Sequence, residues 1–189
     1  DAPVRPDWAR GSAVFALLND EGREPAAIRA AVGELALAAD VVAEEPYVTS
    51  LGRRLPSHDW PDRSLLITAV AATGDPVAWD RGSGVPLDRA VAASCAVPCI
   101  FPPVTVNGSR YMDGGVRSGT NADLAAGAAR VVVLAPLASL RDRGAPAAEM
   151  EALRRRSRVS LIAPDEAALA AIGPQVFDTS RWEPAIEAA

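Results

Sequence analysis

Residues 104–115 read Val-Thr-Val-Asn-Gly-Ser-Arg-Tyr-Met-Asp-Gly-Gly. Asn107-Gly108 lies between two short strand-like runs, and this dipeptide readily supplies the positive φ angles that a two-residue hairpin turn requires. The stretch therefore predicts a β-hairpin whose second strand ends on Asp113. Gly114 and Gly115 follow at once, and we expect one of them at positive φ, turning the backbone sharply beside a cleft.

Upstream, the pattern predicts a second hairpin and several helices. The branched apolar run 65–70 suits a buried strand, and Thr73-Gly74-Asp75 turns it into residues 76–80. Pro86 opens a short helix over 86–96. Residues 1–60 read as mostly helical, because the segment 26–43 repeats apolar residues every three to four positions.

Downstream, helices and strands alternate. We expect helices at about 122–128, 147–156 and 165–172, and strands at 130–134 and 159–163. Such alternation is typical of crossover units and of a mainly parallel sheet covered on both faces. No repeat or low-complexity linker divides the chain, so the sequence predicts an α/β fold with residues 1–189 in a single domain.

Composition excludes several classes of function. The net charge is -5 and no lysine is present, which argues against a general nucleic-acid footprint. No apolar run approaches the ~20 residues of a membrane span, and no signal peptide is visible, so we expect a cytoplasmic protein. Cys95 and Cys99 are interpreted as buried small thiols. We expect no metal and no cofactor.

Four blocks in order carry a resemblance to a known family. They are Ala92-Ala93-Ser94-Cys95-Ala96-Val97-Pro98, then Phe101-Pro102-Pro103, then Tyr111-Met112-Asp113-Gly114-Gly115-Val116, then Asn121-Ala122-Asp123-Leu124. The series resembles the C-terminal half of the patatin-like phospholipases over about residues 60–136. The resemblance implies a patatin-like three-layer fold that is incomplete in this chain, and a serine lipid acyl hydrolase acting on a lipid or ester substrate.

The resemblance also implies a catalytic role for Asp113, which would pair with a serine nucleophile, while Gly114 and Gly115 would shape its loop. A carboxylate within hydrogen-bond reach can accept the serine proton without a histidine. His58 is the single histidine and lies in a proline-bounded loop, so we expect it to be solvated. A Ser-Asp dyad is therefore favoured over a Ser-His-Asp triad.

One motif of the family is absent. The sequence contains no Gly-x-Ser-x-Gly pentapeptide, and Ser83 and Ser118 are the nearest approaches. In relatives this motif and a Gly-rich oxyanion loop lie upstream in crossover units of ~30 residues each, so roughly 60–100 residues would precede Asp1. We therefore expect the chain alone to be inactive, and an open strand edge to cause self-association or to accept that N-terminal half.

The same residues also allow non-catalytic interpretations. Asp113 could stabilise only its own turn, and the protein would then be a non-catalytic α/β interaction module. A further alternative is a doubly wound domain that binds a small molecule, but the sequence has no phosphate-binding glycine fingerprint to support it. Ser94 and Cys95 lie near the expected cleft with no base adjacent in sequence. Asn121 and Asp123 are expected to cap a helix. The run Arg154-Arg155-Arg156-Ser157-Arg158 could attract lipid headgroups, but a solvated helix end is favoured.

Overall fold

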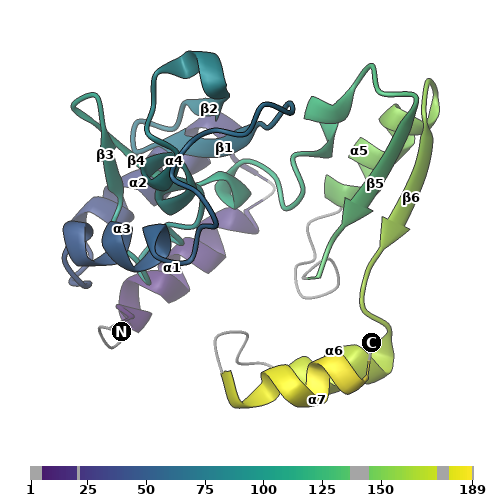
Figure 1. Ribbon diagram of the computed structural model, residues 1–189. Helices are drawn as coiled ribbons and strands as arrows, with labels where there is room; N and C mark the ends of the chain where they lie inside the picture. The colour runs from purple at the N-terminus through teal and green to yellow at the C-terminus, as the bar shows by residue number, and fades with distance from the viewer. Residues whose placement is uncertain (1–5, 21, 137–144, 174–178, 189) are drawn as a thin grey trace. The chain divides into compact units, whose positions relative to one another are not determined.

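The computed structural model describes residues 6–20, 22–136, 145–173 and 179–188. Its contacts divide the chain into two units, Asp1–Ser118 and Gly119–Ala189. Figure 1 labels helices and strands of both units. The mixture of helices and sheets agrees with the predicted α/β class.

The first unit contains a four-stranded sheet, here called sheet A, with strand order β2-β1-β4-β3. Its strands are β1 (Ile67–Ala71), β2 (Pro76–Trp79), β3 (Val104–Val106) and β4 (Ser109–Asp113). Its longer helices are α1 (Trp8–Leu18), α2 (Pro25–Ala38), α3 (Glu44–Gly52) and α4 (Leu87–Ser94). Two short 3-10 turns complete it: η1 (Arg81–Ser83) and η2 (Gly114–Val116).

Both predicted hairpins are confirmed. β1 pairs with β2, and β3 pairs with β4 across a turn in which Asn107 has a φ of 49° and Gly108 a φ of 79°. Both values are positive, as the Asn-Gly turn requires. The predicted helix over 86–96 is α4, with Pro86 at its N-cap.

The expectation of a mainly parallel sheet is wrong for sheet A, where every pairing is antiparallel. The hairpins explain two of the three pairings. β1 and β3 do run in the same direction, but β4 lies between them and pairs antiparallel with both. No parallel pair can therefore form in this sheet.

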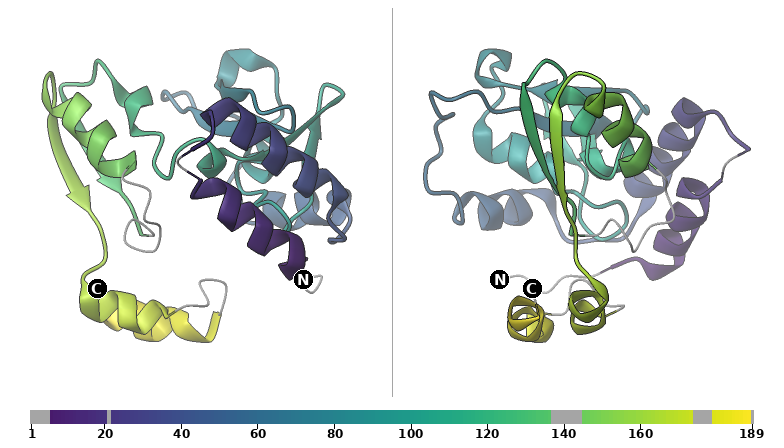
Figure 2. Two further views of the ribbon diagram at one scale, coloured as in Figure 1. Left: turned by 180° about the vertical axis from the view of Figure 1, so that it is seen from behind. Right: turned by 90° about the vertical axis from the view of Figure 1, so that its right-hand side faces the viewer.

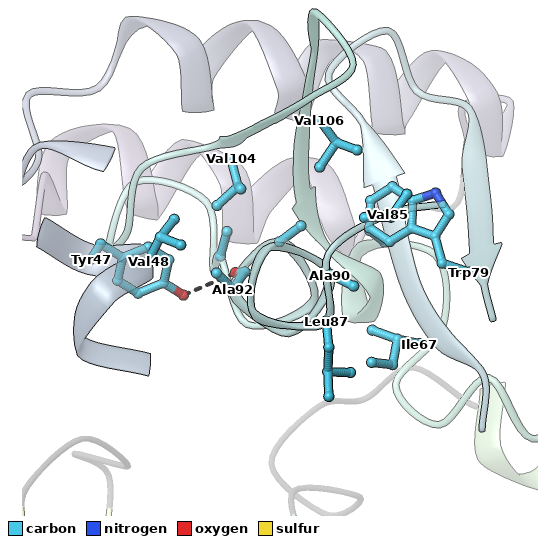
Figure 3. Packing of buried hydrophobic residues seen from close by; sticks show 13 residues of the cluster. Tyr47, Val48, Ile67, Trp79, Val85, Leu87, Ala90, Ala92, Val104 and Val106 are labelled. Atoms are coloured by element: carbon cyan, nitrogen blue, oxygen red, sulfur yellow. Dashed lines mark hydrogen bonds between the residues drawn. The ribbon is translucent and has the colours of Figure 1, made fainter. Parts of the chain in front are cut away.

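Helices cover both faces of sheet A. On one face, α3 and α4 pack through residues such as Tyr47 and Ala90 against Ile67, Trp79 and Val104 (Figure 3). On the other, Val32 of α2 and Val14 of α1 pack against strand residues that include Val70 and Met112. α1 and α2 lie in front of the sheet when the molecule is seen from behind (Figure 2, left). The first unit thus has three layers.

The second unit contains a two-stranded parallel sheet, sheet B, formed by β5 (Arg130–Leu134) and β6 (Arg158–Ile162). α5 (Ala145–Arg154) packs on one face of it through Met150 and Leu153. α6 (Glu166–Ile172) contacts α7 (Trp182–Glu187). The short 3-10 turns are η3 (Ala122–Ala125) and η4 (Thr179–Arg181).

The expected strands and helices of this unit are confirmed, except that the segment expected as a helix over 122–128 is the 3-10 turn η3. Asn121 occupies its N-cap position, but its side chain makes no capping hydrogen bond. The Glu149 carboxylate instead accepts from the Ala122 N–H at 3.1 Å and from the Thr120 hydroxyl at 2.6 Å. A carboxylate far along the chain has replaced the expected local cap.

Candidate active site

Asp113 is the last residue of β4, an interior strand of sheet A. It lies opposite Ala69 of β1, and its N–H donates to the Ala96 carbonyl just beyond α4, at 3.0 Å. Asp113 is half-buried. Strand pairing on one side and the end of α4 on the other therefore fix its main chain.

The register shows which face of the sheet Asp113 shares. Successive side chains of a strand point to opposite faces, so Asp113 lies on the same face as Tyr111, two residues before it. Tyr111 packs edge-to-face on Trp79, with ring centroids 4.8 Å apart, within the cluster that includes α3 and α4. The Asp113 side chain thus belongs to the α3–α4 face.

The Asp113 carboxylate stabilises its own turn. Its Oδ1 accepts a hydrogen bond from the Gly115 N–H at 2.6 Å, capping η2. The Gly114 carbonyl in turn accepts from the N–H groups of Arg117 at 3.1 Å and Ser118 at 3.4 Å. The Asx-turn geometry weighed from the sequence is present, and it holds one carboxylate oxygen in a fixed direction.

The expected positive φ at Gly114 or Gly115 is wrong. The described glycines with positive φ lie elsewhere in the chain. At Gly114 the constraint is close approach, because an added Cβ would lie 2.3 Å from Thr68 Oγ1 and 2.7 Å from the Thr68 carbonyl oxygen. At Gly115 an added Cβ would lie 2.9 Å from Asp113 Oδ1. Gly114 is therefore needed for space against the backbone of β1, whereas a side chain at Gly115 would displace the Asp113 carboxylate.

The charge of Asp113 contributes to the raised pKa values of two nearby groups, Cys95 and Tyr47. Desolvation, and then the Asp113 carboxylate, raise the pKa of the Cys95 thiol, although this side chain reaches solvent. Desolvation followed by the charges of Cys95 and Asp113 raises the pKa of Tyr47. Asp113, Cys95 and Tyr47 therefore share one electrostatic environment, built from β4, the end of α4 and α3. A Cys95 thiol with a raised pKa is a poor nucleophile at neutral pH.

Tyr47 joins α3 to the end of α4. Its hydroxyl donates to the Ala92 carbonyl at 3.2 Å (Figure 3), and its ring stacks on Phe101 with centroids 4.9 Å apart. Sequence reasoning missed this residue, because a contact between positions 47 and 92 leaves no local pattern. The only signal was an isolated tyrosine in a helical segment that is poor in aromatic residues.

The other candidate residues of the sequence differ in their exposure to solvent. Ser94 is half-buried in the last turn of α4, and Cys99 is buried as expected, whereas Cys95 is exposed and the expectation that it is buried is wrong. His58 is exposed, and in the described part of the chain no hydrogen bond or ion pair joins it to Asp113.

Among the described residues, no three histidine, cysteine, aspartate or glutamate side chains gather as a metal site would require. None of the described helices is both long enough and apolar enough to cross a membrane.

Comparison with known families places the site within a recognised segment. No curated protein sequence matches the chain. The profile of the patatin-like phospholipase family matches residues 14–126. This segment runs from within α1 to just past η3, so it contains all of sheet A together with Asp113, Gly114 and Gly115. It also begins well before the region in which the four sequence blocks carry the resemblance. Because the match covers more than half of the 189 residues, the chain belongs to the patatin-like phospholipase family.

Proposed function

We propose that the protein of which these residues form part is a serine lipid acyl hydrolase, and that Asp113 is its catalytic base. The observation that carries the proposal is the position of Asp113 at the end of an interior strand, inside the matched family segment, with Oδ1 fixed by the Gly115 N–H. A fixed carboxylate at a strand end suits proton transfer, because a general base must be held within hydrogen-bond reach of its proton.

The proposed reaction has two steps. A serine hydroxyl attacks the ester carbonyl of the lipid, its proton passes to Asp113, and the alcohol leaves with that proton as an acyl-enzyme forms. Water then attacks the acyl-enzyme, gives a proton to Asp113 and releases the fatty acid, after which the proton returns to serine. The nucleophile would come from a Gly-x-Ser-x-Gly turn, which is absent from these 189 residues, so we expect them to be inactive alone.

Gly114 and Gly115 have a supporting role in the proposal. Side chains at these positions would meet Thr68 and the Asp113 carboxylate, respectively. Substitution of either glycine would therefore displace the Asp113 carboxylate without removing it. We also propose that the nucleophile-bearing segment, or a second copy of the chain, pairs with an open strand edge, and that the protein acts in the cytoplasm.

The test is Asp113→Asn in a protein that carries the nucleophile turn. The amide can still accept from the Gly115 N–H, so the melting temperature should stay nearly constant. Loss of a general base typically costs 10²–10⁴-fold, so hydrolysis of a short-chain chromogenic ester should fall by at least about 100-fold.

His58→Ala is the matched control, and its rate should stay within a few-fold of the parent. If His58→Ala abolished turnover while Asp113→Asn did not, the dyad would be wrong. If Asp113→Asn changed the melting temperature and not the rate, Asp113 would be only a turn residue, as in a non-catalytic interaction module.

A further inference from the structure

Sheet B has one covered and one uncovered face. Along β5, Val131 and Val133 are buried, whereas Val132 and Leu134 are 63% and 70% exposed. The parallel register places Leu134 beside Ile162 of β6, which is 57% exposed. These three apolar side chains, Val132, Leu134 and Ile162, form what we call the bare face.

The bare face is unusual for a parallel sheet. Parallel strands are normally covered on both sides, because the crossover helices pack on the faces. Within the second unit, the described residues cover only the face that carries Val131 and Val133, with Met150 and Leu153 of α5 packed on it. Contiguous exposed apolar residues rimmed by polar ones usually mark an interaction site.

Arginines gather at one end of the same sheet. Arg130 begins β5 and Arg158 begins β6, and the register pairs them on the bare face. The turn that carries Arg155 and Arg156 is fixed beside the start of β5, because the Ser157 hydroxyl donates to the Ala128 carbonyl at 2.6 Å and the Arg158 N–H donates to the Ala129 carbonyl at 2.9 Å. These arginines, together with Arg154 at the end of α5, gather where both strands of sheet B begin, and we call them the arginine rim.

The arginines of this rim are not neutralised by the described part of the chain. Arg130, Arg154, Arg155, Arg156 and Arg158 are all exposed, and none forms an ion pair with a carboxylate of the described residues. Some arginines of the first unit are paired: Arg89, for example, contacts both Glu44 and Glu45. The rim therefore concentrates positive charge in a chain whose net charge is -5.

We propose that the bare face and its arginine rim dock on an anionic lipid surface. An apolar strip enters the boundary between headgroups and acyl chains, while adjacent arginines bind the headgroup phosphates. The purpose of such docking rests on the proposed function, since an acyl hydrolase must meet its lipid at an interface. The binding itself does not depend on catalysis.

Flotation with lipid vesicles tests the docking surface on the whole 189-residue chain. Vesicles of phosphatidylcholine are compared with equimolar phosphatidylcholine and phosphatidylglycerol, and binding should require the anionic lipid. Each arginine near an anionic surface contributes about five-fold to partitioning, so the triple change Arg155→Gln, Arg156→Gln and Arg158→Gln should weaken it on the order of 100-fold. The double change Leu134→Ser and Ile162→Ser should also weaken it.

Matched controls come from the other unit. Arg53→Gln removes an exposed arginine, and Leu37→Ser removes a leucine that is 50% exposed. Both should bind vesicles like the parent. Circular dichroism of every variant checks that the fold is retained.

Three outcomes would overturn the docking surface: no binding to either vesicle, equal loss in the controls, or a concentration-dependent dimer that the Leu134 and Ile162 changes abolish. The last outcome would make the bare face a contact between two copies. Asp113→Asn should bind vesicles normally, so failure of the catalytic proposal and failure of the docking proposal give different results.

Discussion

Sheet A and sheet B differ in strand direction and in how many of their faces are covered. Sheet A has helices on both faces, whereas the described residues cover only one face of sheet B. Sheet A also carries the candidate base, within the segment that the family profile matches. The comparison teaches that helices cover both faces of the family-matched sheet, whereas the region after it presents an apolar surface.

One edge of sheet A, at β3, is covered by side chains. β3 is an edge strand, and next to its two-residue turn the pair Thr105 and Arg110 points its hydrogen-bonding groups outward. Glu44 Oε1 accepts from the Thr105 N–H at 2.6 Å, and Arg89 donates to the Thr105 carbonyl at 3.4 Å. Two side chains thus take the place of a neighbouring strand, which blunts the edge against pairing.

The largest expected effect on stability comes from Gly33→Ala in α2. An added Cβ would lie 1.9 Å from the Ala72 carbonyl oxygen, so α2 would have to move away from sheet A. We expect a loss of more than about 3 kcal/mol, at the upper end of overpacking costs. Urea unfolding followed by tryptophan fluorescence measures this loss.

Gly11→Ala is the matched control, because Gly11 lies in α1 with open space around its Cα. This change should stabilise the protein by about 0.5–1 kcal/mol through helix propensity. Equal effects of the two changes would show that α2 does not pack closely on sheet A.

The next largest effect on stability is expected on the covered face of sheet B, and it is compared with a change on the bare face. Met150 is 2% exposed beneath the covered face, and Met150→Ala should cost about 2 kcal/mol or more. Leu134→Thr on the bare face should change stability by no more than about 0.5 kcal/mol. Hydrogen exchange of the β5 amides reports both, and a large cost for Leu134→Thr would mean that the bare face is covered.

A smaller effect is expected at the edge of sheet A. Glu44→Ala leaves the Thr105 N–H without its carboxylate and should cost about 1–3 kcal/mol. Glu45→Ala removes an exposed partner of Arg89 and should cost no more than about 1 kcal/mol. If thermal unfolding shows the same shift for both, Glu44 does not close the edge.

The smallest effect tests the environment of Asp113. The Asp113 charge helps to raise the pKa of Cys95, so Asp113→Asn should lower that pKa and increase the thiolate fraction at neutral pH. Alkylation of Cys95 by iodoacetamide should become a few-fold faster, while buried Cys99 stays unreactive. If the pH dependence of Cys95 alkylation did not change, the Asp113 carboxylate would be too far from the Cys95 thiol to affect its pKa.

Local patterns predicted much of this fold. Asn107-Gly108 and Thr73-Gly74-Asp75 each specified a hairpin, and both formed. Strand direction within sheet A could not be predicted, because it depends on the position of β4 between β1 and β3. Tertiary packing determines that strand order. For the same reason the sequence could not reveal the contact of Tyr47 with α4, or that of Glu44 with the edge of β3, since the partners are far apart in the chain.

The glycines after Asp113 show where sequence reasoning fails in a different way. A glycine signals either an unusual φ or a lack of space, and the sequence alone does not separate the two. At Gly114 the reason is the approach of Thr68, which lies on another strand. The position was identified correctly, and the reason for it required the structure.

The pairing of Ala69 with Asp113 also has a consequence for the order of folding. Each hairpin of sheet A closes through neighbours in sequence, so each can form early and independently. The contact between them spans the whole of α4 and carries a higher entropic cost of loop closure. The candidate base lies on this seam, so it reaches its final environment only when the two hairpins join, and local opening of the seam would dismantle the site while leaving both hairpins intact.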